Sequence, residues 1–171
     1  PVVYGELLSA GPSAPTVLVY GHYGVQSAAP LGDWNSDPYR PVVRGDELYA
    51  RGASDNKGQI MACVAAVEAV KNAGPPPVNV KFVIEGEEEL GSPNFGSFLT
   101  EHRDLLDGDF VLNPDAGMLG PDAPTIFYGL RGMYVCHLRV FGPSRDLHSG
   151  SYGGVVHNPI HALSHMIAGL H

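Results

Sequence analysis

Several residues of types whose side chains can bind divalent metals follow the predicted strands of this sequence. His22 comes after the apolar run Thr16–Tyr20, and Asp115 follows the short run Asp109–Leu112. The acidic segment Glu85–Glu89 follows a third apolar run. The carboxyl ends of neighbouring parallel strands meet at one edge of a sheet, so these side chains are expected to converge there. One imidazole and several carboxylates form a nitrogen and oxygen ligand set that suits zinc, manganese or cobalt.

Asp55 is a further candidate, and each candidate also has an ordinary structural explanation. Asp55 precedes the helix predicted over 57–73, where a carboxylate is favoured by the helix dipole and can also act as an N-cap. Asp115 could form a turn after Asn113-Pro114, Glu85–Glu89 could be a solvated acidic loop, and His22 could be a loop histidine. These explanations are independent of one another, whereas a metal site accounts for all four features together. We therefore favour a metal site.

The elements that position these residues alternate between strand and helix. β-Branched and aromatic runs predict strands, and apolar residues at helical spacing predict helices. Gly74 and three prolines end the first helix. The predicted order is strand 16–20, short strand 48–50, helix 57–73, strand 78–84, helix 92–106 and strand 109–112. This order predicts an α/β fold, with a mostly parallel sheet and flanking helices.

The pattern changes near residue 132, which predicts a second domain. Alternation from Met133 to Phe141 favours an antiparallel strand with one solvated face. Asn158-Pro159 then begins a predicted helix. We expect a catalytic metal-binding domain over 1–132 and the beginning of an α+β lid or dimerisation domain over 133–171. The chain starts without Met and stops inside the predicted helix, so we expect both domains to be incomplete pieces of a longer protein.

Composition narrows the classes of partner. The 171 residues include 10 Lys and Arg and 18 Asp and Glu, a net charge of −8 that argues against nucleic-acid binding. No apolar run approaches the roughly 20 residues needed to cross a bilayer, and no signal peptide opens the chain. A cytoplasmic protein without membrane partners is expected. The two cysteines are too few for a disulfide framework.

Five segments resemble motifs of the M20 metallopeptidases, which use two metal ions. Gly21–Gln26, Gly52–Gly58 and Glu85–Ser92 resemble motifs of the whole family, while Tyr128–Gly132 and Asp146–Gly154 are similar to its carnosine dipeptidase branch. The resemblance covers nearly the whole chain. It implies a zinc-peptidase-like catalytic domain, a hydrolase that cleaves C–N amide bonds, and two divalent ions, with zinc favoured over manganese or cobalt.

The resemblance also implies a role for each candidate residue. His22, Asp55 and Asp115 would hold one metal, and Asp55 would bridge to a second metal held by Glu89. Glu88 would be the catalytic general base that takes a proton from a metal-bridging water, which then attacks as hydroxide.

His148 would contribute from the lid domain. In this family such a histidine reaches a partner subunit's active site, binds the substrate and supports the oxyanion, so a homodimer is expected. The other explanation is a loop histidine held by Ser149 and neighbouring glycines.

The sequence departs from the family pattern at two points. Relatives carry Asp two residues after the metal-binding His, where this chain has Gly24, and the loss of such support commonly costs about 10–100-fold in metal affinity or activity. We expect Gly24 to leave the imidazole without an acceptor and the loop freer, so that Gly24→Asp would restore activity. Relatives also use a later His as the last ligand of the second metal. We assign that role to none of the histidines at the end of this sequence.

The expected function is metal-dependent hydrolysis of a dipeptide or short peptide, with the 171-residue fragment alone inactive. Two alternatives stay open. One is an N-acyl amino-acid deacylase of the same superfamily. The other is a catalytically impaired metal-binding or association remnant, which Gly24 and the missing last ligand would favour.

Overall fold

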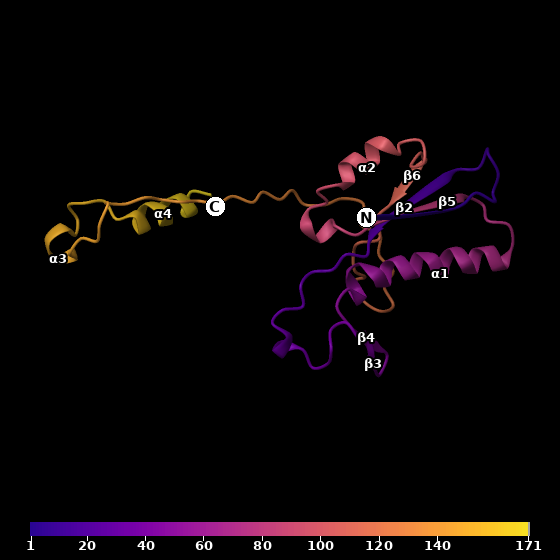
Figure 1. Cartoon of the computed structure of the whole chain (residues 1–171), viewed down its shortest axis with the longest axis horizontal. Coiled ribbons are helices and arrows are strands. Elements are labelled where there is room, and N and C mark those ends of the chain that lie inside the picture. The colour runs from indigo at the N-terminus through magenta and orange to yellow at the C-terminus, as the bar shows by residue number, and fades with distance from the viewer. Residues whose placement is uncertain (171) are drawn as a thin grey trace. The chain divides into compact units, whose positions relative to one another are not determined.

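A four-stranded sheet forms the centre of the first of two compact units in this computed structural model, which describes residues 1–170 (Figure 1). The units cover residues 1–127 and the chain from residue 128 onward. The strands are β1 (Val2–Leu7), β2 (Thr16–His22), β5 (Asn79–Glu85) and β6 (Phe110–Leu112), in the order β1-β5-β2-β6. β2 is parallel to both β5 and β6, and β1 is antiparallel to β5. The expected α/β fold with a mostly parallel sheet is confirmed.

Two helices, α1 (Gly58–Ala73) and α2 (Phe95–Glu101), cover opposite faces of this sheet. The ring of Tyr20 lies 5.5 Å from that of Phe95 in α2. The next residue along β2, Gly21, faces Ile60 of α1 so closely that an added Cβ would lie 2.8 Å from its side chain. Because consecutive strand residues point to opposite faces, the two helices enclose the strand between them. This region supplies the buried core residues Leu18, Val19, Ile60, Val80 and Val83.

Strand register brings the ends of β2, β5 and β6 together at one edge. Val19 pairs with Leu112, and His22 and Asp115 each lie three residues beyond that pair. His22 itself pairs with Glu85, the last residue of β5. The acidic segment therefore begins beside His22, as the parallel arrangement predicts.

Smaller elements complete the two units. β3 (Val42–Arg44) and β4 (Glu47–Tyr49) form a separate antiparallel hairpin, and one-turn 3-10 helices lie at Leu31–Asp33 and Glu88–Leu90. The second unit holds α3 (Ser149–Tyr152) and α4 (Pro159–Ala168), where the side chain of Asn158 accepts a hydrogen bond from the Ile160 N–H, as predicted. Among residues 1–170, no helix is long and apolar enough to span a bilayer.

Two expectations about secondary structure need correction, and one strand was not expected. Residues 133–141 form no strand, because no other segment of the described chain pairs with their backbone and an unpaired strand is unstable. The helix expected over 92–106 is α-helical only over Phe95–Glu101, and tight turns after it return the chain toward β6. β1, an edge strand, was not predicted.

Candidate metal centre

His22 is the buried centre of the candidate site, and its ring is fixed by the hydrogen bond of one nitrogen. The side chain is 0% exposed, at the end of β2. Its backbone N–H donates to Asn56 Oδ1 at 3.2 Å. Its ring Nδ1 lies 2.9 Å from the carbonyl oxygen of Gly24. Because a carbonyl can only accept, Nδ1 is the donor, and the lone pair of the neutral ring is on Nε2. The expectation that Gly24 leaves this imidazole without an acceptor was therefore wrong.

Nε2 of His22 faces carboxylates from three different segments. It lies 3.1 Å from Asp55 Oδ1, 3.2 Å from Asp115 Oδ2 and 3.6 Å from Glu88 Oε2. One ligand atom each from His22, Asp55 and Asp115 falls within a cluster whose members all lie within 4.8 Å of one another. The structure thus brings together the three residues that were expected to hold one metal.

This arrangement fits a cation. A neutral Nε2 is an acceptor, and the carboxylate oxygens around it are also acceptors, so they repel one another unless a positive charge lies between them. Nε2 is buried and has no hydrogen-bond partner of adequate geometry among residues 1–170. A metal ion or a proton would satisfy it. The side chains of Asp55 and Asp115 are 60% and 26% exposed, so one side of the cluster is open to solvent.

Local backbone turns determine where the carboxylates of Asp55 and Asp115 lie. Asp55 lies in the irregular turn Ala53–Lys57, where its φ of −160° and ψ of 89° interrupt the helical path. No side-chain cap is formed at the start of this turn or of α1 within the described chain, so Asp55 is not an N-cap. Asp115 does lie in a turn, because its N–H donates to Asn113 Oδ1 at 3.0 Å. That turn carries the carboxylate toward His22, so the turn and the cluster coexist.

Electrostatics in the cluster shift two pKa values upward. Burial lowers the pKa of His22, but the hydrogen bond to Gly24 and the nearby Asp115, Glu88 and Asp55 carboxylates outweigh it, so the net shift is upward. The pKa of Glu88 is raised by partial burial and by the neighbouring carboxylates, against the opposing effect of His22. A raised carboxyl pKa favours proton transfer near neutral pH, as a general base requires.

Glu89 lies outside the His22 cluster in the described chain, although it follows Glu88 directly. Its Oε2 accepts a hydrogen bond of 2.9 Å from Gln26 Nε2, which also donates to the Glu89 carbonyl at 3.2 Å. Gln26 therefore holds the turn that carries both glutamates. Gln26 and Asn56 were given no role from the sequence, although both lie in the motifs that carry the family resemblance.

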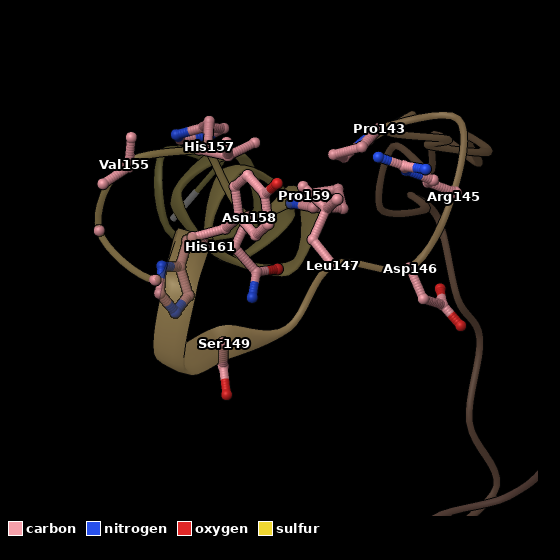
Figure 2. A pocket seen from close by; sticks show the side chains of 15 residues that line it. Pro143, Arg145, Asp146, Leu147, Ser149, Val155, His157, Asn158, Pro159 and His161 are labelled. Atoms are coloured by element: carbon pink, nitrogen blue, oxygen red, sulfur yellow. The ribbon is translucent and has the colours of Figure 1, made fainter.

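His148 and a pocket lie in the second unit. His148 is exposed and its Nδ1 accepts from the Gly150 N–H at 3.1 Å, capping α3. A pocket of about 650 Å³ is lined by residues between Gly142 and His161, from the loop before α3 to the start of α4 (Figure 2). Leu147, Pro159 and His161 line it, while His148 does not. Its residues form no metal-ligating group of three in the described chain.

Proteins of one peptidase family are similar to this chain over most of its length. Residues 18–149 match peptidase family M20/M25/M40. The chain is 38% identical over 164 residues to the Cys-Gly metallodipeptidase of Schizosaccharomyces pombe, covering 94% of this chain and 34% of the relative. It is 36% identical over 173 residues to the human Beta-Ala-His dipeptidase, and this match covers 99% of this chain and 34% of the relative. The crystal structure of an M20 family metallo-carboxypeptidase from Sulfolobus solfataricus has a TM-score of 0.65 and 33% identity, covering 98% of this chain and 38% of the other.

The chain thus spans about a third of the length of the curated relatives named above. The family match nonetheless extends over most of its sequence, from the middle of β2 to the start of α3. The chain belongs to peptidase family M20/M25/M40, a family of hydrolases.

Proposed function

We propose that the protein containing this chain hydrolyses dipeptides or short peptides with the aid of two divalent metal ions. The single observation that carries the proposal is the buried Nε2 of His22, with Asp55 and Asp115 oxygens at 3.1 and 3.2 Å. Relatives named as dipeptidases, 38% and 36% identical to the chain, support the substrate class.

In this proposal, His22, Asp55 and Asp115 hold one ion, and Asp55 and Glu89 contribute to a second. A divalent ion at such a site lowers the pKa of a water molecule and polarises an amide carbonyl. Glu88 is the catalytic base. Its carboxylate lies near the cluster, is 38% exposed and has a raised pKa, so it can accept a proton from water and return it to the leaving amine.

His148 is proposed to act on substrate bound at the active site of a partner subunit. Because Nδ1 of His148 accepts from Gly150, the hydrogen of the neutral ring is on Nε2. An exposed Nε2–H is a donor suited to a developing oxyanion. In this reading the first unit is catalytic, the second begins a lid, and the protein works as a homodimer.

The proposal is tested by comparing two panels of substrates with the full-length protein. We expect dipeptides to be hydrolysed in the presence of zinc or manganese, and N-acetylated amino acids to be hydrolysed much more slowly. Glu88→Gln protein, purified in parallel, corrects for contaminating peptidases. A preference for the acetylated panel would instead identify a deacylase, and no turnover of either panel would refute the proposed hydrolysis.

The number of tightly bound ions is a separate prediction. His22, Asp55 and Asp115 supply three ligands to the first position, whereas Glu89 and a shared Asp55 leave the second position short of ligands among the described residues. We expect the 171-residue chain to bind about one zinc ion tightly and a second weakly, because tetrahedral zinc needs more protein ligands than the second position offers. Calorimetric titration measures this, and two equally tight sites would contradict it.

A further inference from the structure

The loop that follows β2 packs against the turn that follows β5, and Gly24 is at the contact. The N–H of Tyr23 donates to the Glu85 carbonyl at 2.8 Å, so the pairing with β5 continues one residue past the end of β2. This loop begins directly after His22, and the turn carries Glu88. The contact therefore joins two parts of the candidate metal centre.

Space at this contact is too small for any side chain at position 24. A Cβ built on Gly24 would lie 2.4 Å from the carbonyl oxygen of Gly86 and 2.8 Å from its carbonyl carbon, and real Cβ atoms essentially never approach within 3.0 Å. The obstacle is backbone, which cannot rotate away as a side chain can. Gly24 does not have a positive φ, so glycine is needed for space and not for backbone conformation. The expectation of an open, freer loop at Gly24 was wrong.

The Gly24 carbonyl, next to this close approach, is the hydrogen-bond partner of the His22 ring. With residue 24 against Gly86, its carbonyl oxygen is 2.9 Å from His22 Nδ1. A hydrogen bond there places the ring hydrogen on Nδ1 and turns the Nε2 lone pair toward Asp55 and Asp115, and metal-binding histidines are commonly oriented by such a bond.

We propose that Gly24 is a positioning residue for His22, and that its missing side chain is what allows its backbone carbonyl to act as the acceptor. The proposal rests on the proposed metal site. It implies that an aspartate at this position would not improve the site, because its Cβ would displace the loop from Gly86 and move the carbonyl away from Nδ1. Both Gly24→Ala and Gly24→Asp should therefore weaken metal binding.

The experiment uses the full-length protein in three substituted forms. We expect zinc affinity, measured by calorimetry, to fall by about 10–100-fold in Gly24→Ala and also in Gly24→Asp. Gly32→Ala is the matched control, because a Cβ there meets no atom within 4 Å. It should bind zinc as the wild type does. Circular dichroism and thermal melting establish that each variant is folded.

A second measurement does not depend on any variant at position 24 or on metal. In metal-free wild-type protein with ¹⁵N-labelled histidine, long-range ¹H–¹⁵N spectra should show the hydrogen of the neutral His22 ring on Nδ1, with His22→Gln used for assignment. A ring hydrogen on Nε2 would overturn the proposal even if the Gly24 variants failed to fold. Unchanged zinc affinity in folded Gly24→Ala, or tighter binding in Gly24→Asp, would overturn it as well. If the wild type bound no metal, the proposed function would fail, and the His22 spectrum alone would decide the role of Gly24.

Discussion

Glu88→Gln is expected to reduce peptide turnover by the full-length protein about 10²–10⁴-fold while leaving metal content unchanged. Glutamine has the size and hydrogen-bonding capacity of glutamate but cannot accept the proton. Glu88 lies 3.6 Å from His22 Nε2, farther than either aspartate, as expected for a group beside the metal ligands. Steady-state kinetics and metal analysis of the same preparation give the two readouts.

Two neighbouring glutamates provide the controls for this experiment. Glu87 accepts hydrogen bonds from Asn94 at 3.0 and 3.1 Å, and Glu87→Gln should leave turnover within a few-fold of the wild type. Glu89→Gln should instead lower metal occupancy. If Glu88→Gln lost metal and Glu89→Gln kept it with reduced turnover, the proposed roles of base and ligand would be reversed.

Zinc is expected to stabilise the wild-type protein substantially. A ligand present at 100 times its Kd, and bound only by the folded state, adds about 2.7 kcal/mol to the free energy of unfolding. In addition, a cation between His22, Asp55 and Asp115 would remove the repulsion among their acceptor atoms. Thermal or denaturant unfolding with and without zinc measures the effect, and a chelator should reverse it.

Asp115→Asn should lose most of this response to zinc, because an uncharged amide is a poor substitute for a carboxylate ligand. Asp122→Asn, an exposed position in the loop that follows, is the matched control and should respond like the wild type. If the Asp115→Asn protein gained as much stability from zinc as the wild type does, the zinc would have to bind at a different site.

The central sheet and the clustering of candidate ligands were predictable from the sequence for a common reason. β2, β5 and β6 are short runs of apolar and β-branched residues, and parallel strands must place their carboxyl ends together. Residues a few positions beyond each run could therefore be expected to meet. His22 and Asp115 did so because both follow the Val19–Leu112 pair by the same number of residues.

Features that depend on contacts between distant backbone segments were not predictable in this way. The alternation over 133–141 indicates a strand, but a strand also requires a partner, which the described chain does not provide. At Gly24, the sequence shows only that a side chain is missing. That the carbonyl accepts from His22, and that Gly86 occupies the adjacent space, depend on how two loops approach each other.

The three residues of the His22 cluster are anchored with unequal strength, which has a consequence for local dynamics. His22 is the last residue of a central strand paired on both sides, whereas Asp115 follows β6, a three-residue strand at the edge of the sheet in the described chain. Phe110 and Val111 of that strand are 64% and 68% exposed, so little burial opposes its detachment. Elements with few buried contacts open most readily. Asp115 is therefore more prone to local unfolding than His22, and a cation bound by both would tie the edge of the sheet to its centre.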